Sequence, residues 1–254
     1  QDVDGAAEAY DRAIQLEPGN VIALVNLTLL RLEQSRSAEA EALGRRAVAA
    51  DPGNAQAHWH LALALMVNGK LREGWPEFAW RWATDFTAVG RRRWPWPEWQ
   101  GGPLEGRLLV WNEQGIGDAV MFSSLLPELS KQVDLVVECD PRLLGLLGRS
   151  LPGVTLLPRS GVPPETREWP PGIVAQIAAG DIARYLRPDL ASFADHAGAY
   201  LKPDPKRSRR HGDDRPRIGL AWHTRAKFHG ERRRIPLADF LPLLRNDKLH
   251  FVSL

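Results

Sequence analysis

Residues 108–129 read LLVWNEQGIGDAVMFSSLLPEL, and this stretch decides the fold of the chain. It opens with a short apolar run, Leu108 to Trp111, of the kind that buried parallel strands use. Two glycines then allow a backbone path that bulkier residues would resist, and apolar side chains recur at helical spacing from Ala119 to Leu129. The pattern predicts a strand, a tight turn and a helix with Asp118 as its N-cap. In an open α/β sheet, ligands bind at the carboxyl end of such a strand.

Further strand patterns follow this stretch. The apolar run at residues 135–137 predicts a second strand, and residues 154–157 predict a third. Proline pairs interrupt residues 158–210, and no strand is predicted there. Residues 217–222 and 249–254 again read as strands, with a helix start near residue 235 between them. Strands separated by helical pieces indicate a parallel, Rossmann-like sheet.

The N-terminal third contains a repeat of 34 residues. Pro18-Gly19-Asn20 returns as Pro52-Gly53-Asn54, and Ala13 matches Ala47 at the same offset. Self-similarity at this period is typical of stacked helical hairpins, in which small residues lie where two helices pack closely. The pattern predicts helices at about 3–16, 21–34, 37–50, 55–68 and 71–84.

The last hairpin departs from the repeat. Arg81 stands at the position of Ala13 and Ala47, and Trp75, Trp80 and Trp82 make the unit aromatic. Terminal repeats are often atypical because one face meets something other than a repeat. The unit is either a capping helix with exposed arginines or a docking surface for the next domain, and the aromatic density favours docking.

Residues 86–106 join the repeats to the first strand. Three arginines precede Trp94-Pro95-Trp96-Pro97, and alternating tryptophan and proline cannot continue a helix. Basic residues beside aromatics are also found where single-stranded nucleic acid binds. We favour a linker whose tryptophans pack into a domain interface, and we expect no nucleic-acid partner.

The composition is that of an ordinary globular protein. The chain has 254 residues, of which 44% are hydrophobic and 25% charged, and its net charge is +2. The length suffices for about two domains. A single cysteine excludes an internal disulfide framework and a cysteine-based metal site, and fits a reducing compartment. No apolar run approaches the length of a membrane span. These features predict a cytoplasmic protein.

Four motifs together carry a resemblance to a known family. They are Glu113-Gln114-Gly115-Ile116-Gly117-Asp118, Leu126-Pro127, Gly219-Leu220-Ala221-Trp222 and Arg233-Arg234-Ile235-Pro236-Leu237. Joined to the repeats, they resemble bacterial tetratricopeptide-repeat glycosyltransferases, whose GT-B catalytic part has two Rossmann-like halves similar to heptosyltransferases. The resemblance implies an α plus α/β fold. We expect repeats over 1–85, a linker over 86–106, an acceptor-side half over 107–210 and the start of the nucleotide-sugar half over 211–254.

The resemblance also implies a reaction. A sugar would pass from a nucleotide-sugar to a protein or glycan acceptor that the repeats recruit, with no further cofactor. We expect the second half to be truncated at Leu254 and this fragment to be inactive by itself. The alternative is a non-catalytic tetratricopeptide-repeat scaffold that binds proteins.

Two carboxylates on the glycine turn are candidate catalytic residues. An inverting transfer needs a base near the acceptor hydroxyl. The resemblance implies that role for Asp118, and Glu113 on the same turn is the substitute. The alternative for Asp118 is a cap that only satisfies first-turn amides. The expected substrate-binding residues are Gln114, Gly115, Gly117, Trp222, His223, Arg225, Arg233 and Arg234.

The basic loop after Trp222 is the candidate phosphate site. Guanidinium groups suit phosphates, although a solvated basic loop would have the same composition. The family usually has Gly-Asn about where Thr224-Arg225 stands, which leaves the detailed contacts open. His223 and His229 do not predict a metal site. The sequence has neither a Gly-Lys-Ser/Thr phosphate loop nor a third glycine in the turn, which excludes an NTPase and an NAD enzyme.

Overall fold

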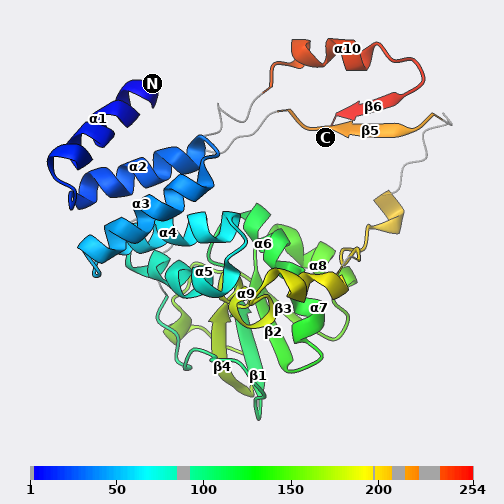
Figure 1. Cartoon of the computed structure of the whole chain (residues 1–254). Helices are drawn as coiled ribbons and strands as arrows, with labels where there is room; N and C mark the ends of the chain where they lie inside the picture. Colours follow the sequence, from blue (N-terminus) through cyan, green and yellow to red (C-terminus); the bar gives the residue numbers. More distant parts are fainter. Residues whose placement is uncertain (1–2, 85–91, 197, 208–214, 223–234, 254) are drawn as a thin grey trace. The chain divides into compact units, whose positions relative to one another are not determined.

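The structure is a computed structural model that describes residues 3–84, 92–196, 198–207, 215–222 and 235–253 (Figure 1). It divides into two compact units, residues 1–204 and residues 205–254. The first unit contains both the helical repeats and a parallel sheet. The second is a small strand–helix–strand segment.

The predicted helices of the repeats are confirmed almost residue for residue. They are α1 (Val3–Leu16), α2 (Val21–Glu33), α3 (Ser37–Ala50), α4 (Ala55–Val67) and α5 (Leu71–Phe78), drawn from blue to cyan in Figure 1. The last helix differs from the prediction, because α5 ends at Phe78 and continues as the 3-10 turn η1 (Ala79–Ala83). Pro76 lies inside α5, where its ring removes a helix hydrogen bond.

Capping and small residues explain the regular hairpins. Asn20 and its repeat equivalent Asn54 are N-caps, and each side chain accepts a hydrogen bond of 3.0 Å from the amide three residues later. Ala47 is fully buried. Any side chain at Gly44 would lie 3.2 Å from the backbone of Leu61. The helices therefore pack at distances that larger residues would not allow.

The sheet has four parallel strands in the order β3-β2-β1-β4. The strands are β1 (Arg107–Trp111), β2 (Asp134–Cys139), β3 (Thr155–Pro158) and β4 (Ile173–Ala178). The chain first moves outward from β1 to β3 and then returns to add β4 on the other side of β1. The strand order therefore reverses between β1 and β4. The sequence pattern predicted the first three strands but not β4.

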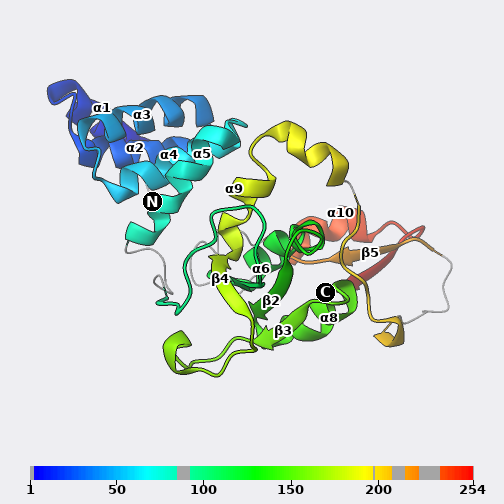
Figure 2. The same cartoon turned by 90° about the horizontal axis from the view of Figure 1, so that it is seen from below.

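Helices cover one face of this sheet (Figure 2). They are α6 (Ile116–Ser123), α7 (Leu126–Leu129), α8 (Leu144–Ser150) and α9 (Ala183–Leu186). Short 3-10 turns occur at Pro141–Leu143, Ala179–Asp181 (η4) and Leu190–His196, and another at Pro164–Thr166 lies in the segment between β3 and β4. Alternate strand residues such as Leu108, Val110 and Ile177 pack with helix residues such as Leu129 and Leu147 to form the main core. This alternation is what a strand with two covered faces requires.

Tryptophans from outside the helices cover the other face. Leu109, Val136 and Ile173 form a second buried cluster against Trp94, Trp96 and Trp169. The linker is also tied to β4, because the amide of Trp99 donates to the carbonyl of Gln176 at 2.8 Å. The tryptophans of the linker thus pack on the sheet, in line with the packed linker that the sequence favoured.

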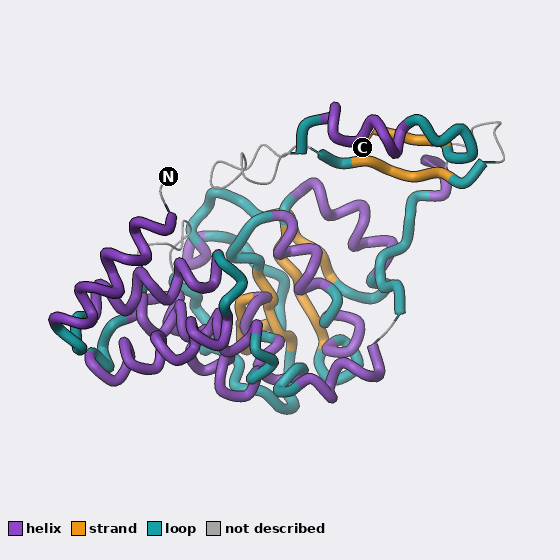
Figure 3. The backbone as a smooth tube through the Cα atoms, turned by 45° about the horizontal axis from the view of Figure 1, so that its top comes forward, coloured by secondary structure: helices purple, strands orange, loops and turns teal. Residues whose placement is uncertain are grey.

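The second unit contains a pair of strands with short helical turns between them. Strands β5 (Arg217–Leu220) and β6 (His250–Ser253) pair in parallel, with η8 (Leu237–Phe240) and α10 (Leu241–Leu244) between them in the chain (Figure 3). A 3-10 turn at Pro205–Arg207 precedes β5. Across the described residues of both units, no helix is long and apolar enough to cross a membrane.

Candidate active site at the carboxyl edge of the sheet

The turn that leaves β1 holds Asp118 in a different helix position from the predicted one. The N-cap of α6 is Gly115, and Asp118 is the third residue of the first turn. Its carboxylate Oδ2 accepts a hydrogen bond from the Gly115 amide at 3.1 Å. The prediction of Asp118 as N-cap was therefore wrong, because an acid at this position reaches back to the N-cap amide. The side chain remains partly exposed.

The turn glycines also have a different role from the one expected. Neither Gly115 nor Gly117 has a positive φ; Gly115 has φ −69° and ψ 172°, which any residue adopts. A side chain at Gly117 would meet nothing within 4 Å. Gln114, Gly115 and Gly117 are all exposed. Gly117 therefore borders open space, and neither glycine is needed for an unusual backbone path.

Glu113 lies in a contrasting environment to Asp118. Only 5% of this residue is exposed. Its Oε1 contacts Nη2 of Arg81 at 3.1 Å, and its Oε2 lies 3.5 Å from the Gly180 amide. Burial raises the pKa of the Glu113 carboxyl, Arg81 opposes that rise, and the neighbouring Asp181 adds to it. This carboxylate is thus part of a buried cluster and does not face solvent.

The guanidinium of Arg81 is the centre of this cluster. Arg81 is 1% exposed, and its two terminal nitrogens contact the two carboxylate oxygens of Asp181 at 2.7 and 2.8 Å. The guanidinium lies over the rings of Phe78 and Trp82, each at 4.3 Å from the ring centroid. A bidentate pair enclosed by aromatic rings is the arrangement for which arginine is better suited than lysine.

The last hairpin therefore docks onto the sheet. Besides the Arg81 contacts, the indole Nε1 of Trp75 donates to the carbonyl of Arg187 at 2.6 Å. Trp82 packs beside Trp111 of β1, with ring centroids 5.5 Å apart. The predicted docking surface is confirmed, and the alternative of a cap with exposed arginines is wrong for Arg81.

The two carboxylates that Arg81 contacts mark the point where the strand order reverses. Glu113 follows β1, and Asp181 lies in the η4 turn that follows β4. Because β1 and β4 are neighbours in the sheet although β2 and β3 come between them in the chain, their carboxyl ends form the position at which open α/β sheets bind ligands. In this chain the position holds a guanidinium supplied by the repeats.

A pocket of about 330 Å³ lies beside this cluster. It is lined by Ala79, Trp80, Trp82, Ala83, Glu98, Asp181 and Arg184. Trp80 is held in place because its ring stacks on His58, with centroids 4.0 Å apart and planes 4° from parallel. The pocket thus combines two indole walls from the last hairpin with charged groups from the sheet side.

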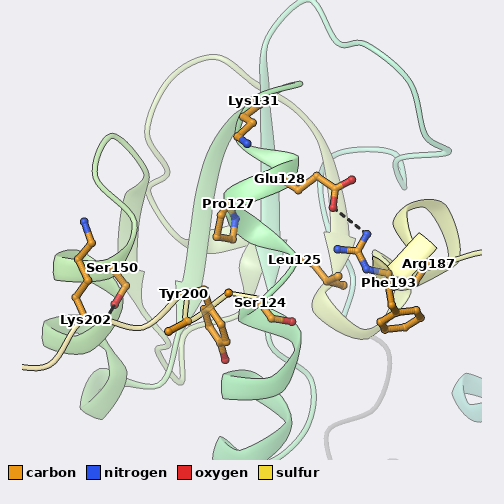
Figure 4. Close-up of a pocket in the computed structure, with 12 residues that line it drawn as sticks. Ser124, Leu125, Pro127, Glu128, Lys131, Ser150, Arg187, Phe193, Tyr200 and Lys202 are labelled. Carbon is orange, nitrogen blue, oxygen red and sulfur yellow. Dashed lines mark hydrogen bonds and ion pairs between the residues drawn. The ribbon is translucent and has the colours of Figure 1, made fainter. Parts of the chain in front are cut away.

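A larger pocket of about 450 Å³ lies at the other end of α6 (Figure 4). Ser124 and Leu125 line it from the end of that helix, and Tyr200 and Lys202 line it from the segment near the end of the first unit. An ion pair of 2.8 Å between Glu128 and Arg187 closes one side. Because Asp118 is on the first turn of α6, this pocket is separate from the carboxyl edge.

Cys139 lies at the carboxyl end of β2 but is not a candidate nucleophile. It is fully buried. Burial, together with the charges of Asp140 and Glu138, raises the pKa of its thiol to about 11. A thiol in that state is protonated at neutral pH and unreactive. Within the described residues, no group of three or more histidine, cysteine, aspartate or glutamate side chains is placed to hold a metal ion.

The remaining predicted residues belong to the second unit. Trp222 is half-buried, and its carbonyl accepts a hydrogen bond from the amide of Ile235 at 3.2 Å. His223, Arg225, Arg233 and Arg234 lie outside the described residues.

Sequence reasoning also missed functional candidates in the first unit, namely Gly180, Asp181 and Arg184. The apolar run IVAQIA followed by Ala-Gly-Asp was the available signal, since it repeats the pattern of a buried strand leading into a small-residue turn.

Comparisons with known proteins bear mainly on the repeats. A tetratricopeptide-repeat family model matches residues 1–55 and 29–74. Protein FlbA of Caulobacter vibrioides is 28% identical over 279 aligned residues, which cover 100% of this chain and 46% of FlbA. The chain thus spans about half the length of this curated relative.

Two solved structures share limited similarity. A MamA RS-1 ArsTM double mutant is 22% identical, with a TM-score of 0.32 over 35% of this chain and 50% of that one. A mutant O-GlcNAc transferase of Thermobaculum terrenum is 21% identical, with a TM-score of 0.32 over 57% of this chain and 37% of that one. The family model supports tetratricopeptide repeats over residues 1–74, and a four-stranded parallel sheet follows them.

Proposed function

We propose that this chain is the acceptor-side part of a nucleotide-sugar-dependent glycosyltransferase of GT-B architecture, similar to heptosyltransferases. The observation that carries the proposal is the setting of Asp118. Its carboxylate lies partly exposed on the first turn of α6, at the carboxyl end of the central strand. Within the described residues, the Asp118 carboxylate accepts a hydrogen bond from the Gly115 amide alone. One oxygen thus orients the side chain while the other is available to a substrate.

The chemistry assigns different roles to the two carboxylates. In an inverting transfer, Asp118 accepts the proton of the acceptor hydroxyl as that oxygen bonds to the sugar carbon and the nucleotide diphosphate departs. Glu113 is unsuited to this step, because its oxygens face Arg81 and Gly180 inside the protein. We therefore keep Asp118 as the base and assign Glu113 to the support of the turn.

The donor side of the proposal rests on the second unit. Gln114, Gly115 and Gly117 would border the acceptor, while Trp222, His223 and Arg225 would line the nucleotide-sugar site. Arg233 and Arg234 would neutralise the departing diphosphate, because guanidinium groups match phosphate geometry. The donor is a substrate in this scheme, and no further cofactor is needed.

The experiment is carried out on the native full-length protein, because the chain spans about half of its curated relative. Titration calorimetry with a panel of nucleotide-sugars should find one that binds, and Arg233→Glu should weaken that binding. Lys248→Glu is a control in the same unit, since Lys248 is exposed and lies beyond the basic loop. Equal affinities in wild type and Arg233→Glu would contradict the assignment of the loop to the diphosphate.

A protein-binding scaffold is the second candidate function. The family-model match over residues 1–74 favours it, since stacked helical hairpins form extended binding surfaces. The two functions separate in one assay. Intact mass measurement of a captured partner should show a sugar-sized increase with the donor if the protein is a transferase. Capture without any donor-dependent mass change would support the scaffold.

A further inference from the structure

The repeat position that Arg81 occupies ordinarily holds a small residue. Ala47, one period earlier, is fully buried between helices. Arg81 differs from Ala47 in its local backbone as well, because α5 ends at Phe78 and position 81 lies in the 3-10 turn that follows. The guanidinium reaches residues 32 and 100 positions further along the chain. In the last unit, a repeat position that elsewhere packs helices together thus contacts the turns that follow the sheet strands.

The Arg81 guanidinium is needed to balance the negative charges of Glu113 and Asp181. The charged groups that face Glu113 are Arg81 from the η1 turn and Asp181 from the η4 turn. One cation therefore faces two carboxylates, all of them largely removed from water. Removal of the guanidinium would leave the buried Glu113 carboxylate facing that of Asp181, which is largely shielded from water, and like charges in such a site cannot both stay ionised at low cost.

The contact between Arg81 and Glu113 also holds the turn that carries Asp118. Glu113 is wedged between Arg81 and Gly180, where even a Cβ on residue 180 would lie 2.5 Å from Oε1 of Glu113. Two residues later, Gly115 is fixed by the carboxylate of Asp118. The segment between β1 and α6 is therefore anchored at both ends, once by the repeats and once by its own helix.

We propose that Arg81 is a positioning residue of the carboxyl-edge site, through which the last helical hairpin of the repeats holds the 112–118 turn in place. The proposal goes beyond sugar transfer, because it concerns the geometry of the turn whichever ligand binds there. Ordering of the turn then depends on the docking of the repeats. A change in that docking would alter the exposure of Glu113 and the orientation of Asp118.

Hydrogen exchange measured by mass spectrometry on the full chain tests this directly. Arg81→Met should raise exchange about tenfold in peptides covering residues 112–119 and 179–183, while protection of α2 to α4 is retained. Arg81→Lys should give a smaller increase, since lysine keeps the charge but loses the bidentate geometry. The double variant Arg81→Met with Glu113→Gln should recover protection, because one of the two unpaired charges is gone.

The matched control is Arg72→Met. Arg72 also joins the last hairpin to the sheet side through a 2.9 Å ion pair with Asp189, but its side chain is 75% exposed. This control should leave the 112–119 peptides unchanged. The proposal is overturned if Arg81→Lys leaves exchange in the turn at the wild-type level, or if Arg81→Met affects α4 and α5 as strongly as the turn. It is also overturned if Glu113→Gln fails to restore protection.

Discussion

The regular hairpins and the last hairpin differ most clearly at one shared position. In the regular unit, Ala47 is fully buried and lets two helices approach each other. In the last unit, Arg81 at the same register is equally buried but contacts Asp181 and Glu113 beyond the repeats. The comparison teaches that two buried residues at the same repeat position can be buried against entirely different parts of the molecule.

Among the variants that test this comparison, Arg81→Ala should lower the free energy of unfolding most. It leaves the buried carboxylate of Glu113 and the partly buried one of Asp181 without their cation, and removing one partner of a buried pair costs about 3–5 kcal/mol. Urea unfolding would measure the loss. Arg72→Ala is the control, and because its ion pair is exposed it should cost less than about 1 kcal/mol. Similar losses in the two variants would mean that the buried cluster adds nothing beyond a surface pair.

Ala47→Leu tests whether the regular hairpins require a small residue at this repeat position. The site is fully buried, and Gly44 one turn earlier already lies close to Leu61, so added methylenes have no free space. Overpacking of this kind costs about 1–3 kcal/mol. Ala38→Leu, at an exposed position of the same helix α3, should be nearly neutral in thermal unfolding. A neutral Ala47→Leu would show that the helices are less closely packed than the structure indicates.

The repeats and the cluster around Arg81 each contain a buried glutamate, Glu41 and Glu113, and the two should respond to pH in opposite ways. Burial would raise the pKa of Glu41 in the repeats, but hydrogen bonds from Lys70, Asn68 and Arg45 lower it to about 2. The stability that Glu41 contributes is therefore complete above about pH 4.5 and lost as pH falls toward 2. Burial raises the pKa of Glu113 above its ordinary value of 4.5. The stability that Glu113 contributes is therefore complete below about pH 4.5 and is lost as pH rises through the raised pKa.

Chemical unfolding across pH 2–8 checks both directions. The stability difference between wild type and Glu41→Gln should grow as pH rises from about 2 to 4.5 and then stay constant. Glu113→Gln should match wild type in acid and become relatively more stable above about pH 4.5. The same sign of pH dependence in both variants would contradict the assigned environments.

Much of this architecture could be predicted from local sequence patterns. The 34-residue period located five helices, because Ala47 and its equivalents mark close packing. The first three strands followed from short apolar runs. Strand β4 was missed because proline pairs at 163–164 and 170–171 obscure its start. Its pairing with β1 is a long-range contact that local periodicity does not reveal.

The candidate site was less predictable for the same reason. Asp118 and Glu113 were found on the correct turn, but their environments depend on contacts that local patterns do not contain. The environment of Glu113 is set by Arg81 and by Asp181, which follows the strand that was missed. The helix position of Asp118 depends on where the backbone becomes helical, a boundary that sequence patterns locate poorly.

The contrast between Asp118 and Glu113 allows the most direct test of the proposed site. Asp118→Asn keeps an oxygen that can accept the Gly115 hydrogen bond, so melting temperature and donor binding should change little. In the full-length protein its turnover should fall by about 10²–10⁴-fold, the usual contribution of a positioned base. Glu113→Gln should retain most of its turnover. Full activity in Asp118→Asn, or its loss only in Glu113→Gln, would contradict Asp118 as the base.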